Sequence, residues 1–275
     1  MGLKNLAKII NNATKEKTFE ERFIYELNET ISRSQQPRQP SRTFKPSSLG
    51  GCMRRMFFEV TGAEVDKAKP ADAGLVGINE SGTDRHERLQ KHIASMKEFG
   101  FNVEWVDVAD FIEQHQPKGT RVVERKGMET KLFNEILNLS FMSDGIIKID
   151  GVHYILEIKT EASFKWQGRI APEEKHIFQA ASYSVALGVS KVIFIYENRD
   201  VCAKKAYLIE ITQEMKEERV YARIESINES IRLNQLPEMT TEKKECNYCP
   251  FTVVCNRAGE AGVGYDATIV EAGND

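Results

Sequence analysis

The chain alternates between stretches whose apolar residues recur at helical spacing and stretches that read as strands. We expect helices at residues 3–33, 84–99, 172–187 and 212–233, and strands within residues 122–159, 191–196 and 206–211. Thr83 can cap the second helix, and Gly100 and Gly188 can end the second and third. This order predicts a mixed α/β layer architecture with a helical N-terminal part and a cysteine-bearing C-terminal part.

A tight hairpin is expected at Asp150-Gly151, because a two-residue type I′ turn needs positive φ at both positions. In that register Asp144 lies opposite Glu157. One face of the hairpin is then apolar and suited to a core, with Ile147, Ile149, Val152, Tyr154, Leu156 and Ile158. The other face is mainly polar and holds Asp144, Lys148, His153, Glu157 and Lys159, with Ile146 opposite Ile155 among them. A bulge at Gly145 would shift this register.

Two carboxylates that face each other on a sheet repel, so Asp144 and Glu157 need something to neutralise them. A divalent cation held between the two would do so. Alternatively, this is an ordinary half-exposed hairpin in which Lys148 and Lys159 flank the acids as a solvated polar face. The hairpin alone leaves both interpretations open.

The five cysteines are too few and too unevenly spaced for a disulfide framework. Cys246, Cys249 and Cys255 fall within one short stretch, where thiolates at this spacing bind zinc or an iron–sulfur cluster. A fourth ligand must come from elsewhere, and Cys52 is the natural candidate. Cys202 stands alone and is expected to be a free thiol.

The net charge of −3 taken alone argues against a nucleic-acid partner, but it hides an asymmetry along the chain. Residues 32–58 hold no acidic residue and six basic ones, namely Arg33, Arg38, Arg42, Lys45, Arg54 and Arg55. The sequence contains no helicase-type phosphate loop and no apolar run long enough to span a membrane. We therefore expect a cytoplasmic protein with a basic surface that can bind anions.

Several short motifs occur together in one order. His86 ends a Gly-Thr-Asp-Arg-His stretch, twelve residues separate Asp144 from Glu157-Ile158-Lys159-Thr160, and Gln179-Ala-Ala-Ser-Tyr183 follows. With the four cysteines, this set over residues 47–257 resembles the PD-(D/E)XK nucleases. The similar branch is the RecB-like one, which includes the CRISPR-associated RecB-like exonucleases and the AddB nuclease domain. The resemblance implies a restriction-endonuclease-like core, a mixed β-sheet flanked by helices.

The resemblance also implies a divalent metal, Mg²⁺ or Mn²⁺, held by His86, Asp144, Glu157 and the main-chain carbonyl of Ile158. Lys159 would orient the attacking water or stabilise the charge that develops at phosphorus. Gln179 and Tyr183 share one helix face, which would overlook the metal and position the DNA strand. Glu129 matches an acidic position that many relatives carry ahead of the aspartate, although Glu124 or Glu135 could also be aligned there.

By the same resemblance, a 4Fe–4S cluster would be bound by Cys52, Cys246, Cys249 and Cys255, with zinc as the alternative. Such a cluster would join distant parts of the chain and have a structural role. It would also fix Arg54 and Arg55 in space as DNA-binding groups, unless these belong to a solvated basic segment. The rings of Phe44, Phe57 and Phe58 could stack on unpaired bases or could equally belong to the core.

These expectations describe a metal-dependent DNA exonuclease that is specific for single strands and acts in recombination, repair or replication. Its partners would be DNA ends and a helicase or recombination chain. The alternatives are a non-catalytic DNA-binding or assembly subunit with the same fold, and a nuclease active only within a complex. We expect three parts: N-terminal helices and a basic linker at residues 1–46, the nuclease domain at 47–257, and a disordered acidic tail at 258–275.

Overall fold

The computed structural model of the 275-residue chain describes residues 18–36, 39–66, 72–239 and 243–261. These residues belong to two compact units. The first unit contains α2 (Phe19–Ser34) and the first two turns of α5 (Ala73–Ala94), up to Glu80. The second unit contains the rest of the described chain. None of the helices in the described ranges combines the length and apolar character that a membrane crossing requires.

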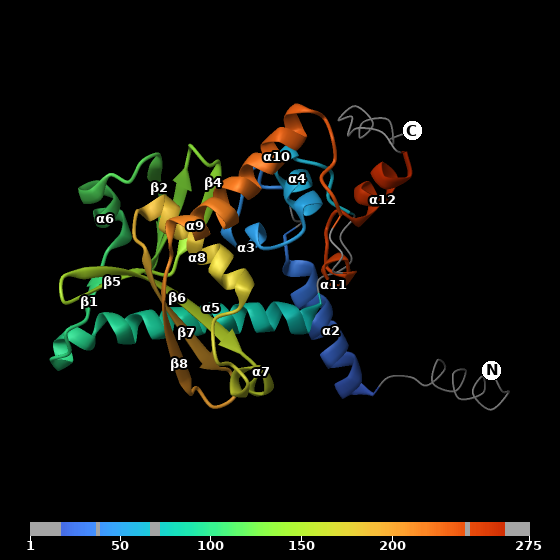
Figure 1. The fold of residues 1–275 in the computed structure, drawn as a ribbon. Helices are drawn as coiled ribbons and strands as arrows, with labels where there is room; N and C mark the ends of the chain where they lie inside the picture. Colours follow the sequence, from blue (N-terminus) through green and yellow to red (C-terminus); the bar gives the residue numbers. More distant parts are fainter. Residues whose placement is uncertain (1–17, 37–38, 67–71, 240–242, 262–275) are drawn as a thin grey trace. The chain divides into compact units, whose positions relative to one another are not determined.

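Two β-sheets form the centre of the second unit (Figure 1). The larger sheet has the strand order β1-β5-β6-β7-β8, with β1 (Glu104–Val106), β5 (Ile146–Ile149), β6 (Val152–Glu161), β7 (Lys191–Asn198) and β8 (Lys204–Glu210). Its central pair, β6 and β7, is parallel, and its other pairs are antiparallel. The smaller sheet is antiparallel and contains β2 (Thr120–Lys126), β3 (Glu129–Asn134) and β4 (Leu139–Ser143).

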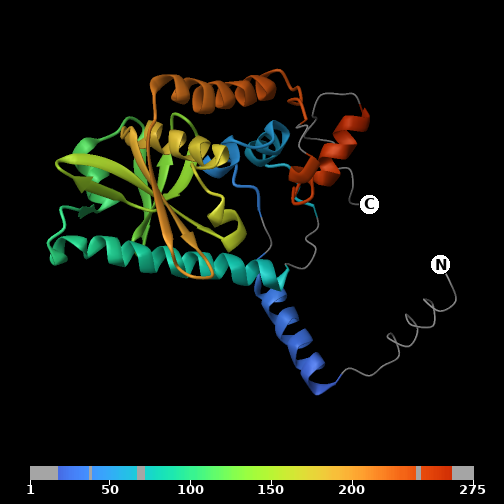
Figure 2. The ribbon, with the colours of Figure 1, turned by 60° about the horizontal axis from the view of Figure 1, so that its bottom comes forward.

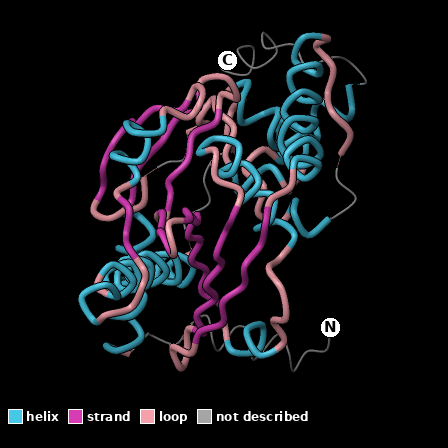
Figure 3. Tube along the Cα trace, turned by 60° about the vertical axis from the view of Figure 1, so that its left-hand side comes forward, coloured by secondary structure: helices cyan, strands magenta, loops and turns pink. Residues whose placement is uncertain are grey.

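Helices cover both faces of the larger sheet, as Figures 2 and 3 show. On one face, Leu89 and Ile93 of α5 pack against Ile147, Leu156 and Ile158. The opposite face carries α8 (Glu174–Leu187), whose buried alanines share a core with Ile146 and Ile155. This arrangement confirms the predicted mixed α/β class. It buries Ile147, Leu156 and Ile158 of the apolar face expected for the hairpin, whereas Val152 beside the turn is exposed, and it covers the opposite face as well.

The hairpin has the predicted turn. Asp150 and Gly151 have φ values of 50° and 79°, and Ile149 pairs with Val152. The ladder keeps this register as far as Ile146, which pairs with Ile155, and β5 ends there. Asp144 therefore lies just outside the strand instead of directly opposite Glu157.

Shorter helices complete the second unit: α3 (Pro46–Leu49), α4 (Met53–Thr61), α6 (Val108–His115), α7 (Ser163–Gln167), α9 (Gln213–Lys216), α10 (Ala222–Arg232), α11 (Lys243–Cys246) and α12 (Thr252–Ala261). Phe44, Phe57 and Phe58 are buried in the main core. Of the two interpretations of these rings, the core one is correct and base stacking is wrong. Helix α12 includes the first four residues of the expected tail, and residues 262–275 lie outside the described part of the chain.

Helix α5 begins well before the predicted start at residue 84. The carboxylate of Asp72 accepts the main-chain N–H of Leu75 at 3.0 Å and caps the helix there, so Thr83 lies inside it. The α-helix ends at Ala94, and a 3₁₀ turn (Met96–Phe99) continues to the predicted stop at Gly100. The prediction missed the earlier cap and took the middle of the helix for its beginning.

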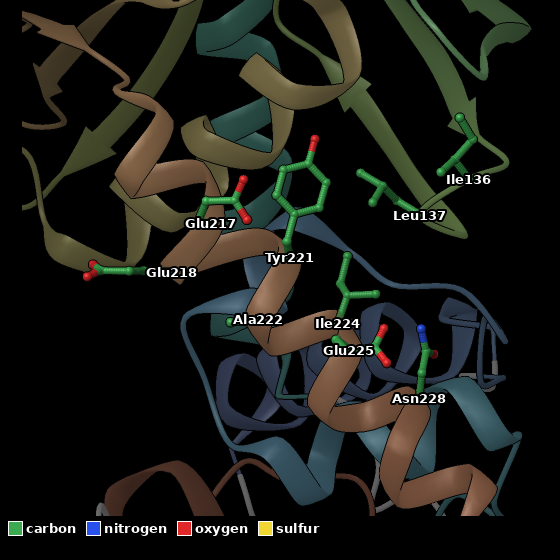
Figure 4. A pocket seen from close by; sticks show the side chains of 9 residues that line it. All are labelled: Ile136, Leu137, Glu217, Glu218, Tyr221, Ala222, Ile224, Glu225 and Asn228. Atoms are coloured by element: carbon green, nitrogen blue, oxygen red, sulfur yellow. The ribbon is translucent and has the colours of Figure 1, made fainter.

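The long helix predicted at residues 212–233 is interrupted. Thr212 caps α9, but a π-helical turn (Glu217–Tyr221) separates α9 from α10. A groove of about 550 Å³ lies between this turn and the residues Ile136 and Leu137 that connect β3 to β4 (Figure 4). The groove shares no residue with the hairpin that carries Asp144 and Glu157.

Candidate functional site

Asp144 is held in place by two elements that are distant in sequence. Its Oδ2 accepts the main-chain N–H of Ile158 at 2.7 Å, so the side chain continues the hairpin after the ladder has ended. Its main-chain carbonyl accepts Nε2 of Gln90 at 2.7 Å, and Gln90 is buried on α5. Gln90 was not among the predicted site residues, although its position one turn after His86 places both on the same helix face.

The next residue, Gly145, allows the chain to leave the strand at this point. Its φ is 148°, and a side chain added here would collide with the ring of Trp105. A glycine is therefore required both by the backbone conformation and by the close approach of the indole. The backbone is irregular at Gly145, the expected bulge position. Residues 146–149, which follow it, keep the predicted register with β6.

A histidine and two carboxylates meet at this end of the hairpin. Nδ1 of His86 lies 3.5 Å from Oδ1 of Asp144. Glu129 opens β3, and one ligand atom from each of His86, Glu129 and Asp144 lies within 4.8 Å of the other two. Among the described residues, this is the one group of three or more such side chains with that spacing. The structure thus brings Glu129 to the site, and neither Glu124 nor Glu135 belongs to the group.

The charges in this group shift the pKa values of His86 and Glu129. Burial lowers the pKa of His86, but the hydrogen bond and charge of Asp144 outweigh burial and raise the pKa above its ordinary value. Burial, reinforced by the charge of Asp144, raises the pKa of Glu129. A cation placed among these side chains would relieve the repulsion between the carboxylates and compete with the proton on His86.

Glu157 is the most deeply buried carboxylate of the site, with a side chain only 1% exposed. One of its oxygens forms an ion pair with Nζ of Lys159, but Oε2 has no hydrogen-bond partner among the described residues. Burial raises the pKa of Glu157 to about 7, with a further upward contribution from Asp144 and an opposing one from Lys159. Burying a carboxylate oxygen without a hydrogen-bond partner costs free energy, so Oε2 is a candidate ligand atom for a cation.

Lys159 connects Glu157 to α8. Its Nζ donates to Oε1 of Gln179 at 3.1 Å, and Nε2 of Gln179 donates to the hydroxyl of Tyr183 at 2.7 Å. Burial lowers the pKa of Lys159, but the charges of Glu157 and Asp144 more than compensate and leave it raised. Burial also raises the pKa of Tyr183 well above its ordinary value, so the phenol stays neutral. The structure therefore brings together all of the predicted catalytic side chains from β6 and α8.

A buried carboxylate, Glu197 on β7, ties the helix that carries His86 to the sheet. Arg85 and Arg88 flank His86, and they contact Glu197 at 3.0 and 2.6 Å. The side chain of Glu197 is fully buried, and Lys204 on β8 contacts it at 3.5 Å. No local sequence signal marks this cluster, because its members come from three elements that only the fold brings together.

The four candidate cluster cysteines lie on α4, α11, α12 and the turn between the last two. Cys52 is the N-cap of α4, and Figures 1 and 2 show α4 beside α11 and α12. Burial raises the pKa of Cys249, and the charges of Cys52 and Cys255 raise it further, so these three thiols are neighbours. In the described part of the chain, no three cysteine sulfurs lie within 4.8 Å of one another.

The two arginines that follow Cys52 lie among these cysteines. Arg54 donates from Nε to the carbonyl of Pro237 at 2.8 Å, and its Nη1 lies 3.9 Å from Sγ of Cys255. The charge of Arg55 lowers the pKa of Cys249, against the dominant effect of burial. These contacts account for the position of Arg54, and binding of DNA by either arginine stays a prediction.

No protein-family model matches the chain, and neither does any curated protein. Among solved structures, the chain is similar to one described as SSO0001, with 20% identity and a TM-score of 0.45 over 87% of this chain and 98% of that one. It is also similar to an alkaline exonuclease (LHK-Exo) from Laribacter hongkongensis, with 15% identity and a TM-score of 0.40 over 70% and 92% of the two chains. A complex of LHK-Exo with dAMP gives 15% identity and a TM-score of 0.38 over 76% and 95%.

Proposed function

We propose that the chain is a divalent-metal-dependent nuclease that hydrolyses phosphodiester bonds in DNA. One observation carries the proposal: Oε2 of Glu157 is buried without a partner beside His86, Glu129 and Asp144, with the ammonium of Lys159 adjacent. A purely structural ion-pair cluster would satisfy its buried oxygens internally. A carboxylate oxygen left open beside two more carboxylates and an imidazole suits Mg²⁺ or Mn²⁺.

In this proposal His86, Asp144 and Glu157 bind the metal, and Glu129 and the main-chain carbonyl of Ile158 complete the site. A metal bound there would act as a Lewis acid on a phosphate oxygen and lower the pKa of a bound water. Asp144 is fixed from both sides, by Ile158 and by Gln90, so its other oxygen, Oδ1, which contacts His86, has a defined direction. Preorganised ligands of this kind avoid reorganisation during the reaction.

Lys159 supplies the positive charge that the protein itself contributes to the reaction. Its raised pKa keeps the amine protonated at neutral pH, so it can orient the attacking water and stabilise the charge that develops on phosphate. Gln179 holds the ammonium through its Oε1, and Tyr183 holds Gln179. In this role Gln179 and Tyr183 orient Lys159, and through it they set the position of the scissile phosphate.

We propose that the preferred substrate is single-stranded DNA ends. The protein would shorten these ends by exonucleolytic cleavage in recombination, repair or replication. The resemblance of the sequence motifs to the RecB-like nucleases supports this preference and the restriction-endonuclease-like core of residues 47–257. A helicase or recombination partner would supply the single strands, since the sequence has no helicase-type phosphate loop.

Cleavage assays with Asp144→Asn and Lys159→Ala test the proposal. Purified wild-type and variant chains are incubated with Mg²⁺ or Mn²⁺ and with single- and double-stranded DNA labelled at the 5′ or the 3′ end. We expect Asp144→Asn to abolish cleavage, and Lys159→Ala to reduce its rate by about 100-fold or more. Matched controls are Asp150→Asn, which keeps a turn sequence suited to type I′ geometry, and Lys148→Ala in the same hairpin.

The outcome separates three functions. Cleavage by the wild type that survives Asp144→Asn would show that the activity does not come from this site. Binding without cleavage by the isolated chain would favour the non-catalytic subunit. Cleavage that appears only when a helicase or recombination partner is added would favour a nuclease active within a complex.

We also propose that Cys52, Cys246, Cys249 and Cys255 hold a 4Fe–4S cluster. The resemblance of the cysteine set to that of the RecB-like nucleases supports the cluster over zinc. In the structure, Nη1 of Arg54 lies 3.9 Å from Sγ of Cys255, and Cys52 is the N-cap of α4. A cluster there would link α4 to α12 and stabilise the fold.

Anaerobic purification tests the cluster directly. We expect a brown protein with broad visible absorbance and about four iron atoms per chain, a stoichiometry fixed by the cluster type. Cys52→Ser should remove the colour, whereas Cys202→Ser should keep it. A colourless protein with stoichiometric zinc would refute this assignment and leave the nuclease site untouched.

A further inference from the structure

A short segment that directly follows β6, the strand of Glu157 and Lys159, exposes two large apolar side chains to solvent. This α7 segment covers residues 163–170, and in it Phe164 is 76% exposed and Ile170 is 89% exposed. No motif of the sequence assigned this segment a role.

The base of the α7 segment is fixed to the sheet by many contacts. Nε1 of Trp166 donates to the carbonyl of Tyr196 on β7 at 2.9 Å. Nζ of Lys205 on β8 donates to the carbonyls of Trp166 and Arg169 at 2.8 and 2.9 Å, and it lies 4.5 Å from the centre of the Trp166 ring. The hydroxyl of Tyr207 also donates to the carbonyl of Arg169, at 2.8 Å.

The first turn of the segment is fixed as well. The main-chain N–H of Ser163 donates to Oδ2 of Asp200 at 3.1 Å, and its hydroxyl donates to Oδ1 of Asn198 at 3.0 Å. The exposure of Phe164 and Ile170 is therefore not that of side chains on a loosely attached loop. A rigid backbone presents them to solvent.

Ion pairs connect the α7 segment to β6 and to the N-cap residue of α8. Arg169 binds Glu161, which lies two residues after Lys159 on the same face of β6, through Nε at 2.8 Å. Arg169 also binds Glu173 at 2.7 Å. The charge of Glu173 is one of the causes that raise the pKa of Lys159. Glu173 thus forms an ion pair with Arg169 of the segment and also acts on the charge of Lys159.

Two cations accompany the apolar side chains. Lys165 lies on α7, is exposed and forms no ion pair within the described ranges. Arg199 follows β7 beside Asp200; hydrogen bonds from Ser163 lower the pKa of Asp200, and the charge of Arg199 lowers it further. Aromatic and apolar side chains beside cations are the combination that binds single-stranded nucleic acid, because bases stack on rings and phosphates approach the cations.

We propose that the α7 segment binds the unpaired bases of a DNA strand that passes through the active site. Phe164 stacks on a base, Ile170 packs against its neighbour, and Lys165 and Arg199 attract the phosphates between them. This proposal rests on the nuclease function proposed above and names the surface that selects single strands. A double helix cannot use this surface, because its bases are already stacked on each other.

Binding measurements in a cleavage-deficient background test the proposal. Asp144→Asn serves as the parent, and fluorescence anisotropy follows a fluorescein-labelled oligothymidylate. Adding Phe164→Ala should weaken binding by at least about fivefold, the lower end of what one stacked base contributes, and Phe164→Trp should restore it. The matched control is Phe99→Ala, since Phe99 is 75% exposed and lies outside the α7 segment.

Each result decides the matter. Unchanged affinity in Phe164→Ala, or equal weakening by Phe164→Ala and Phe99→Ala, would overturn the proposal and leave the α7 segment as a surface for a protein partner. Weaker binding of a blunt duplex in Phe164→Ala, to the same extent as of the single strand, would also contradict it. If the wild type cleaves DNA but Phe164→Ala leaves the affinity for the single strand unchanged, the nuclease function stands and the α7 segment has another role. If neither cleavage nor binding occurs, both proposals fail together.

Discussion

Glu197 offers a sharp test of how the fold positions its candidate metal ligands. Its carboxylate is fully buried and contacts Arg85, Arg88 and Lys204, and the two arginines flank His86 on α5. The substitution Glu197→Gln keeps the shape of the side chain and removes its charge. Two guanidinium groups then lose the carboxylate that compensates them.

The cost follows from the burial of the pair. Removing one partner of a buried ion pair costs about 3–5 kcal/mol, and the lower value applies because the side chains of Arg85 and Arg88 are 23% and 41% exposed. About 3 kcal/mol corresponds to a fall in Tm of roughly 6–12 °C for a chain of this size. Since His86 lies between the two arginines, Mn²⁺ should also bind more weakly.

Urea denaturation and isothermal titration with Mn²⁺ measure the two effects on the same sample. Glu210→Gln, an exposed carboxylate on β8, is the control and should change neither quantity. A loss of stability below about 1 kcal/mol, typical of exposed ion pairs, would refute the argument from burial. A large loss of stability with unchanged Mn²⁺ affinity would show that Glu197 stabilises the fold without positioning His86.

Four further predictions concern the site itself. Because burial raises the pKa of Glu157 to about 7, its proton competes with metal, and titration calorimetry should show Mn²⁺ binding that strengthens from pH 6 to 8 and releases protons. Because its pKa is raised on folding, protonated Glu157 favours the folded state. In metal-free protein, denaturation curves at fixed salt should show this stabilisation in full below about pH 4.5 and its loss as the pH rises through about 7. Gln90→Leu should cost about 1–3 kcal/mol and weaken Mn²⁺ binding, because it leaves the carbonyl of Asp144 without its donor; equal Mn²⁺ affinity in the variant would contradict this. Gly145→Ala should destabilise the protein in thermal denaturation, because its φ of 148° and the ring of Trp105 exclude a side chain; an unchanged Tm would argue against this crowding.

Local signals in the sequence predicted the hairpin well. The Asp150-Gly151 turn sets the register, and side chains alternate along β6, so Glu157 and Lys159 could be placed together on one face. Gln179 and Tyr183 could be placed on one face of a helix from their spacing alone. The stop at Gly188, where φ is 71°, was likewise readable because glycine tolerates this conformation.

Contacts between elements distant in sequence could not be predicted in the same way. The position of Asp144 outside the ladder depends on Gln90 and on the ring of Trp105, neither of which is marked by a motif. The early start of α5 depends on a cap by Asp72 in a stretch with weak periodicity. The π-helical turn in the long helix has no sequence signature that distinguishes it from an α-helix.

The site that contains Asp144 is assembled from elements spread over much of the chain, from α5 through β3 and the hairpin to α8. No two adjacent elements supply it, and Asp144 acquires its orientation only when α5 packs beneath the hairpin. A partly folded chain would therefore present separate carboxylates but no set that could bind metal tightly. High-affinity metal binding would therefore report on completed folding, and the nuclease activity proposed above would be absent from incompletely folded molecules.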